Sequence, residues 1–290
     1  FNVPSTPQLR GLGTDSGTGF WAISDGTGAD LGKGATDQLV RLDSSGNVTS
    51  TISTPLTKLD GVAYLNGSLW VVDNQNHCGD GIDPFCQSFH NNRIFQVSPT
   101  SPPAPNESAW GALTSFSAGF EPEEMGGITV EGSGSSGSLW LAIRGGHAFI
   151  NLSQSGSQLS NPGVDSFVGD FDALALSGNF LYTASGSKIV QWTKTGSRVQ
   201  EFQAIKESGG AQIPGLRGMT FKLVSAKSVL FLAGSEGTVY KGFFAEAVTN
   251  TPVGIAMSPA GSAVGNALWI VTDAPVKDKI LKVNTSTGAL

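Results

Sequence analysis

The sequence is poor in charge. Charged side chains make up 14% of its 290 residues, against about a quarter in a typical soluble domain. The 17 Lys and Arg residues are scattered and form no cluster, and the formal net charge is -6. Phosphate backbones and anionic membrane surfaces are bound through clustered cations, so neither nucleic acid nor an acidic membrane is an expected partner. No apolar run approaches the ~20 residues that a membrane span needs.

Cysteine is equally scarce. Cys78 and Cys86 lie eight positions apart in a polar loop, where a disulfide would staple a segment that has no apolar core of its own. The alternative is a metal cluster with the flanking His77 and His90, although zinc usually takes its four ligands from closer Cys pairs. With a start at Phe1 that is typical of a processed N-terminus, the disulfide predicts a secreted, extracellular protein.

Five glycosylation sequons agree with that location, although a chain rich in Ser and Thr would contain several by chance. They permit N-glycosylation at Asn47, Asn66, Asn106, Asn151 and Asn284.

Glycine is abundant, at 39 residues, and it separates short apolar runs, a pattern typical of all-β proteins. An apolar pair of the Leu-Trp type recurs at Phe20-Trp21, Leu69-Trp70, Leu139-Trp140, Leu181-Tyr182, Leu230-Phe231 and Leu268-Trp269. A small residue opens a strand before each pair, namely Gly11, Gly61, Gly127, Ala173, Gly218 and Gly254. A third strand of alternating pattern follows each pair, and in all units but the last a fourth strand comes after it. The aromatic member of the pair is expected to fill the space between neighbouring sheets.

Six units of four short strands predict a single all-β domain over residues 1–290, a six-bladed β-propeller with four-stranded blades. The alternative architecture for many short strands is a β-sandwich. The predicted blades cover residues 8–54, 55–118, 119–168, 169–205, 212–248 and 249–290. The last unit stops where its fourth strand should begin, and residues 1–11 resemble residues 48–61. We therefore expect residues 1–7 to form the outer strand of the last blade and to close the ring.

The first strand of each blade lines the central channel, so the residue just before each opening small residue should lie at the channel mouth. These residues are Arg10, Asp60, Gly126, Asp172, Arg217 and Val253. Arg144, after the second strand of the third unit, and His147, at the start of its third strand, are expected on the same face. The arginines and aspartates of neighbouring blades predict either compensating ion pairs or a polar site for a ligand or cation.

The loop after the second strand of the first unit is rich in oxygen ligands and glycine. Asp25, Asp30 and Asp37 in this loop could hold a calcium ion, and calcium is the one cofactor that the residues suggest. The alternative is that these carboxylates accept hydrogen bonds from their own turns.

The repeat unit resembles the six-bladed propellers of the SMP-30/gluconolactonase, streptogramin lyase and NHL-repeat type. The similar stretches are residues 59–73, LDGVAYLNGSLWVVD, and 278–288, DKILKVNTSTG. In gluconolactonase-like members, Glu, Asn and Asp at the start of the first strands hold a metal. Asp60 and Asp172 match as acidic residues, whereas Arg10 and Arg217 would oppose a divalent cation. The acid/base histidine of the lyases has no clear counterpart.

Two hypotheses of function follow. The first is a secreted, non-catalytic propeller that binds a small-molecule, glycan or protein ligand, or acts in extracellular assembly, through its channel face. The second, which the resemblance implies, is a metal-dependent lactonase, hydrolase or lyase that uses Asp60 and Asp172.

Overall fold

The structure is a computed structural model that describes residues 3, 8–15, 17–25, 36–56, 58–74, 93–100, 115–117, 125–144, 148–164, 170–206, 211–213, 215–224, 227–242, 251–257, 267–273 and 279–284. The chain divides into two compact units, Phe1–Gly242 and Phe243–Leu290. No helix in the described part is long and apolar enough to cross a membrane.

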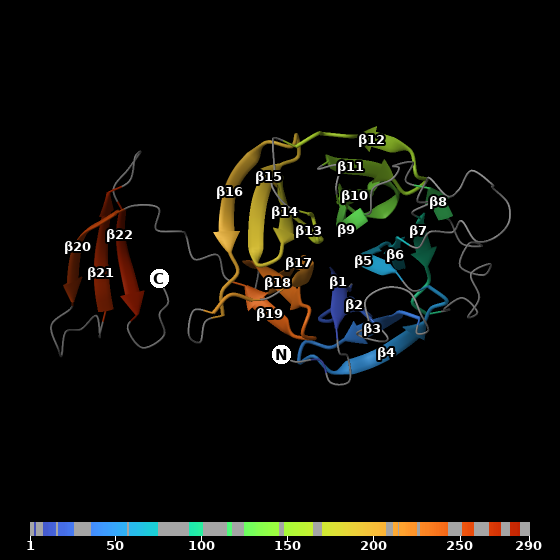
Figure 1. Cartoon of the computed structure of the whole chain (residues 1–290), viewed down its shortest axis with the longest axis horizontal. Helices are drawn as coiled ribbons and strands as arrows, with labels where there is room; N and C mark the ends of the chain where they lie inside the picture. The colour runs from blue at the N-terminus through green and yellow to red at the C-terminus, as the bar shows by residue number, and fades with distance from the viewer. Residues whose placement is uncertain are drawn as a thin grey trace. The chain divides into compact units, whose positions relative to one another are not determined.

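The first unit is a ring of five antiparallel sheets in which strands adjacent in sequence pair (Figure 1). Blade 1 has β1 (Leu9–Thr14), β2 (Phe20–Ser24), β3 (Gln38–Leu42) and β4 (Val48–Ser53). Blade 2 has β5 (Leu59–Leu65), β6 (Ser68–Asp73), β7 (Arg93–Val97) and β8 (Ser115–Ser117). Blade 3 has β9 (Met125–Glu131), the 3₁₀ turn η2 (Gly134–Ser136), β10 (Ser138–Ile143), β11 (Ala148–Ser153) and β12 (Gln158–Ser160).

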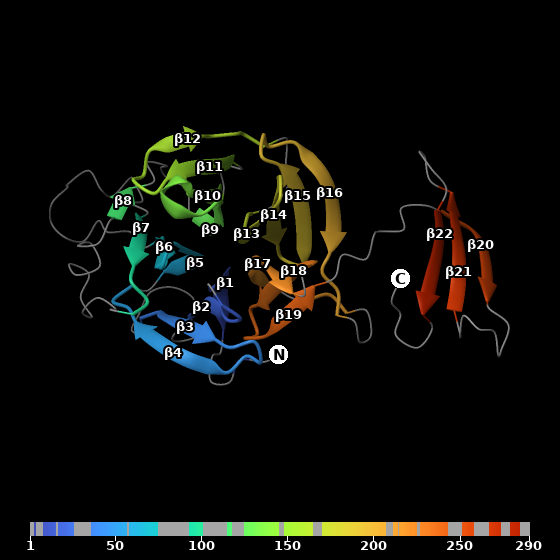
Figure 2. The same ribbon diagram turned by 180° about the vertical axis from the view of Figure 1, so that it is seen from behind.

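Blade 4 has β13 (Ala173–Ser177), β14 (Phe180–Ser185), β15 (Lys188–Thr193) and β16 (Arg198–Gln203). Blade 5 has three strands, β17 (Leu216–Val224), β18 (Lys227–Gly234) and β19 (Val239–Gly242). The first strand of each blade is innermost, and in the four-stranded blades the fourth is outermost, as both faces of the ring show (Figures 1 and 2). This arrangement defines a β-propeller.

The small residues that open the first strands allow these strands to pack backbone against backbone. A β-carbon added to Gly11 would lie 2.9 Å from the Val62 nitrogen in blade 2. One added to Gly218 in blade 5 would lie 2.7 Å from the carbonyl carbon of Gly11 in blade 1. Blade 5 therefore packs directly on blade 1, and the ring closes with five blades.

The predicted number of six blades is therefore wrong. The place that a sixth blade would take, between blades 5 and 1, is filled by one apolar core that includes Leu12 and Phe20 from blade 1 and Phe231 and Val239 from blade 5. The rings of Phe20 and Phe231 have their centroids 4.7 Å apart. This contact excludes a further sheet from the seam.

The aromatic residue of each Leu-Trp pair fills the space between blades, as predicted. Five apolar clusters correspond to the five interfaces of the ring, and each contains the second-strand aromatic residue of one blade. These residues are Trp21, Trp70, Trp140, Tyr182 and Phe231, and each is buried. Burial of large rings between sheets is the main apolar contribution to ring stability.

Val3, near the N-terminus, contacts blade 5, which is the last blade of the ring. The backbone N–H of Val3 donates to the carbonyl oxygen of Gly237 at 2.9 Å, and the Val3 side chain is buried against Val239 and its neighbours. Residues 1–7 were predicted to complete a sixth blade. The blade that Val3 contacts is instead blade 5, the last blade of the ring. Residues 1, 2 and 4–7 lie outside the described part of the chain.

Deleting residues 1–6 should destabilise the ring, because it removes the buried Val3 and its backbone hydrogen bond to Gly237. The loss of the Val3 side chain and its backbone hydrogen bond is worth about 2–4 kcal/mol. That corresponds to a fall in melting temperature of roughly 4–16 °C for a unit of this size. Circular dichroism melting measures it, with Val199→Ala as the control because Val199 is 47% exposed on β16. An unchanged melting curve after the deletion would show that the ring closes without this segment.

The second unit contains a three-stranded sheet of β20 (Thr251–Met257), β21 (Ala267–Asp273) and β22 (Lys279–Asn284). Its register shift falls between Pro252 and Gly254, at the same place in the repeat as the shifts in β5 and β17. The sixth repeat therefore folds as a blade-like sheet of its own. The predicted single domain over residues 1–290 stays a prediction.

Candidate functional site: a charged cluster at the centre of the ring

The channel-mouth side chains come from one end of the ring, where first strands begin and second strands end. In blades 2 and 5 the pairing of the first two strands skips one residue, between Leu59 and Gly61 and between Leu216 and Gly218. The skipped residues are Asp60 and Arg217, and such β-bulges commonly redirect a side chain next to a functional site. In both blades the charged residue therefore occupies the bulge, and the glycine that follows it packs closely against the backbone of a neighbouring blade.

Six charged residues form one chain of ion pairs through all five blades. In order along this chain they are Asp25, Arg10, Asp60, Arg144, Asp172 and Arg217, and we call them the central charged cluster. The successive N–O distances are 2.9, 3.6, 3.7, 3.5 and 3.2 Å. Side-chain exposure is 10–20% for the first five residues and 43% for Arg217. The cluster is therefore half-buried, with one guanidinium open to solvent.

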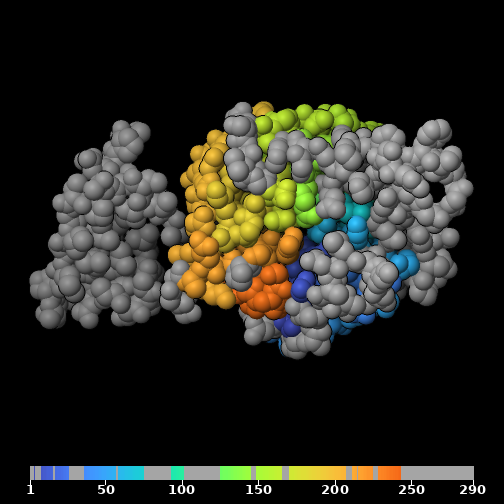
Figure 3. Space-filling view, in the orientation of Figure 1, coloured from blue at the N-terminus to red at the C-terminus, as the bar shows by residue number. Residues whose placement is uncertain are grey.

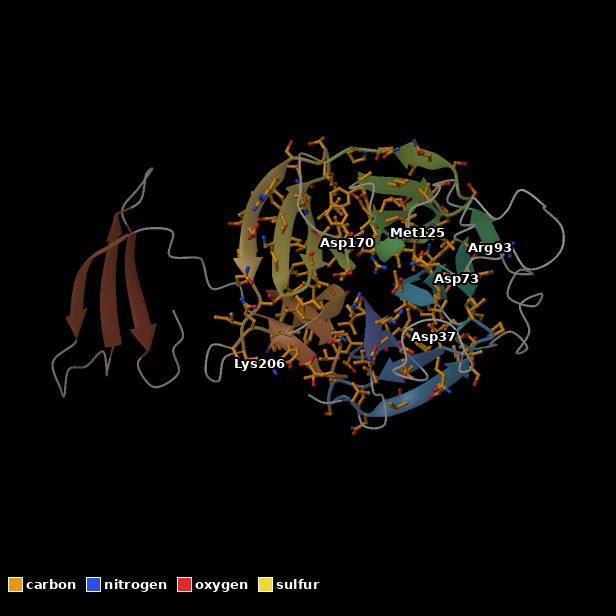
Figure 4. All side chains as sticks on the ribbon, viewed as in Figure 1. Asp37, Asp73, Arg93, Met125, Asp170 and Lys206 are labelled. Atoms are coloured by element: carbon orange, nitrogen blue, oxygen red, sulfur yellow. The ribbon has the colours of Figure 1, made fainter. Side chains whose placement is uncertain are left out.

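Asn74 fixes the carboxylate of Asp60 in place. Its Nδ2 donates to Asp60 Oδ2 at 2.6 Å and to the Met125 carbonyl at 2.9 Å, and its Oδ1 accepts the Met125 N–H at 2.9 Å. Asn74 is 1% exposed. Blades 2 and 3 are thus joined by one amide that also orients the middle of the cluster. Figure 4 shows Met125 and Asp73 on these two neighbouring blades.

Asp37 lies beside the cluster in a buried position. Its Oδ2 accepts the Leu59 N–H at 2.7 Å, and its backbone carbonyl accepts the Thr54 hydroxyl at 2.7 Å. Burial raises the pKa of Asp37 to about 7, the neighbouring charges of Asp25 and Asp60 act in the same direction, and the Leu59 N–H and Arg10 oppose them. Asp37 therefore ties the crossover from blade 1 to blade 2 and changes charge near neutral pH.

Burial also acts on the pKa of Asp172. It raises the pKa of this carboxyl, although Arg217 and Arg144 both act to lower it. Arg217 Nη1 donates to Asp172 Oδ1 at 3.2 Å, and the Gly186 N–H donates to Asp172 Oδ2 at 3.4 Å.

Among the residues predicted as a ligand site on the channel face, the structure brings together Arg10, Asp60, Arg144, Asp172 and Arg217. His147 lies outside the described residues, as do His77, His90, Cys78, Cys86 and Asp30. Within the described ranges no three His, Cys, Asp or Glu side chains group as metal ligands. The calcium prediction for Asp25, Asp30 and Asp37 and the disulfide both stay predictions, and Asp25 is engaged by Arg10.

The sequons differ in how their asparagines are used. Asn47 Nδ2 donates to Asp43 at an exposed turn. Asn66 donates to the Gly134 carbonyl and accepts the Gly134 N–H, so it holds η2 against the β5–β6 turn. Asn151 lies in β11 and has a buried Oδ1. Asn106 lies outside the described residues, and Asn284 is the last residue of β22. Glycosylation stays a prediction; among the described asparagines, Asn47 and Asn66 are exposed.

Sequence reasoning missed two features of the cluster. It placed Arg144 on the correct face but did not predict that this side chain bridges Asp60 and Asp172 into one chain. It also did not single out Asn74, although a polar residue directly after a buried strand at this end of the ring was a usable signal.

Comparison with known proteins supports the fold. No family model and no curated protein matches the sequence. Glutaminyl cyclase from Myxococcus xanthus is similar in structure, with a TM-score of 0.55 at 12% identity over 83% of this chain and 92% of the cyclase. Virginiamycin B lyase from Staphylococcus aureus gives a TM-score of 0.44 at 12% identity over 98% of this chain and 84% of the lyase. The chain is therefore a β-propeller, a class that includes enzymes.

Proposed function

We propose that this protein is an extracellular β-propeller that binds a small polar ligand at its central charged cluster. The observation that carries the proposal is the convergence of six charged side chains from all five blades on one end of the ring. Half-buried ion pairs contribute little net stability. A set this extensive is therefore better explained by recognition than by folding, and convergent polar groups are typical of ligand sites.

The balance of charge in the cluster indicates the kind of ligand. Three arginines and three aspartates alternate, so the cluster has a formal charge near zero and no strong long-range attraction for an ion of either sign. It presents donors and acceptors side by side over a short distance. A small molecule with both hydrogen-bond donors and acceptors would fit this pattern better than a metal ion, because Asp60 and Asp172 are each next to two arginines.

A thermal-shift screen tests the proposal. Glycine, lactate, glucose, putrescine and a lactone would be the probes, with wild type, Arg144→Gln and Asp60→Asn compared. We expect at least one probe to stabilise wild type and to lose at least tenfold in apparent affinity in both variants. Arg41→Gln is the matched control, since Arg41 pairs with Asp15 at 2.8 Å in blade 1 outside the cluster. Equal responses in wild type and both cluster variants would contradict a central site.

An acid–base enzyme, such as a lactone hydrolase or a lyase, is the second candidate. The observation in its favour is Asp37, because a carboxyl with a pKa of about 7 suits general acid–base catalysis near neutral pH. The fold is shared with a glutaminyl cyclase. This candidate requires a substrate to reach Asp37, which is 2% exposed. A lactone-hydrolysis screen with and without a chelator tests it, and Asp37→Asn should abolish any turnover found.

A further inference from the structure

The central charged cluster is an open chain and not a closed ring. Going around the blades, arginine and aspartate alternate from Arg10 to Asp60, Arg144, Asp172 and Arg217. At the seam between blades 5 and 1 this alternation fails, because Arg217 and Arg10 follow one another. The two residues precede Gly218 and Gly11, whose backbones pack together with only 2.7 Å between the Gly11 carbonyl carbon and a β-carbon added to Gly218. Two cations thus start from adjacent points of the inner ring.

Each of these arginines contacts a carboxylate away from the seam. Arg10 contacts Asp25 at 2.9 Å and Asp60 at 3.6 Å, and Arg217 contacts Asp172 at 3.2 Å. Among the described residues no carboxylate pairs with both arginines. Arg217 engages only its Nη1 there, so the Nε and Nη2 donors of a guanidinium that is 43% exposed face no described partner.

We propose that the seam of blades 5 and 1 binds a carboxylate group, and that this is the anionic end of the ligand taken by the central cluster. The inference rests on the proposed function and adds the ligand class. Arg217 is the anchor, because the Nε and Nη2 edge of a guanidinium matches the two oxygens of a carboxylate. Arg10 supplies the second positive charge from the neighbouring strand.

The charge of the surroundings favours a carboxylate over a phosphate. Asp25, Asp60 and Asp172 already balance the three arginines, so a bound monoanion brings the cluster to one negative charge and a phosphate dianion to two. The second negative charge would face the aspartates, which disfavours it. A donor group on the same ligand, such as an ammonium or a hydroxyl, could reach the carboxylates of Asp172 or Asp60.

Anion-dependent stability of wild type, Arg217→Gln and the control Arg198→Gln tests the inference. Arg198 is a suitable control, because its side chain is 45% exposed and pairs with one carboxylate, Glu201, on the outer strand of blade 4. The probes are sodium acetate and sodium phosphate, each measured against sodium chloride at equal ionic strength. We expect acetate to raise the melting temperature of wild type and of Arg198→Gln, with an apparent affinity at least tenfold weaker in Arg217→Gln.

Three results would overturn it: an acetate response that survives in Arg217→Gln, equal responses to acetate and chloride, or tighter binding of phosphate than of acetate. Failure here is distinguishable from failure of the proposed function. A neutral or cationic probe that binds wild type, is lost in Arg144→Gln and is retained in Arg217→Gln would leave the central site in place and refute the carboxylate seam alone.

Discussion

Replacing Gly126 by alanine is expected to lower the free energy of unfolding of the five-bladed ring by roughly 4 kcal/mol or more, or to prevent its folding. A β-carbon at this position would lie 1.3 Å from the carbonyl oxygen of Phe171 in blade 4. Phe171 cannot move aside easily, because it is fully buried and stacks on Phe149 with 5.3 Å between ring centroids. The strands of blades 3 and 4 would have to separate to admit one methyl group.

Urea unfolding followed by circular dichroism and tryptophan fluorescence measures this effect. Gly163→Ala is the matched control, since a β-carbon there has no heavy atom within 4 Å, and it should change the midpoint very little. If Gly126→Ala unfolded at the same urea concentration as the control, the close packing of blades 3 and 4 would be wrong.

Asp37→Asn should remove a pH dependence of stability. Burial raises the pKa of Asp37 to about 7, above the ordinary pKa of an aspartate, which is about 3.9, so between these values the folded protein holds a proton that the unfolded chain releases. Stability therefore falls as pH rises through this window, by up to about 1.4 kcal/mol per pH unit, and levels off above pH 7. The asparagine variant carries no proton to lose, and its oxygen can still accept the Leu59 N–H.

Denaturant unfolding at pH 5, 6, 7 and 8 distinguishes the variants. Wild type should lose stability from pH 5 to 7, whereas Asp37→Asn should show a shallower slope and exceed wild type at pH 8. Asp43→Asn is the control, because Asp43 lies at an exposed turn where its carboxylate accepts the Ser45 and Asn47 N–H groups. Parallel pH profiles for wild type and Asp37→Asn would refute the role assigned to this buried carboxyl.

The repeat in the sequence predicted that each unit folds as an antiparallel sheet, but it did not predict how many of these sheets close the ring. The small residues and the second-strand aromatics are local signals, and they appear at the inner contacts and at the interblade cores. Closure depends instead on which sheets pack together although they are far apart in the sequence. Here Phe20 packs against Phe231, and Val3 contacts blade 5. The sixth repeat has the same pattern as the others, so the pattern could not predict that the ring of the first unit closes with five blades.

The sequence could predict which residues belong to the candidate site but not which ion pairs they form. Arg10, Asp60, Asp172 and Arg217 share one position of the repeat, which is why a pattern could find them. Arg144 lies after a second strand, and its bridging contacts depend on side-chain direction across the channel. Asp37 was predicted as a calcium ligand from the composition of its loop, whereas its side chain accepts a backbone N–H from the next blade.

The candidate site at the centre of the ring is formed by several blades and not by one. In the space-filling view, atoms from early, middle and late parts of the chain meet near the middle of one face of the first unit (Figure 3). Any ligand held there would touch several blades at once, so binding and ring stability should be coupled.

The most direct test is NMR of the arginine side chains. The chain has six arginines, of which Arg10, Arg144 and Arg217 belong to the central charged cluster and Arg41, Arg93 and Arg198 do not. In protein labelled with ¹⁵N-arginine, titration with the probe selected by the thermal-shift screen should shift the Nε–H signals of the first three residues and leave the other three in place. Shifts confined to Arg41, Arg93 and Arg198, or equal shifts for all six, would contradict a ligand site at the centre of the ring.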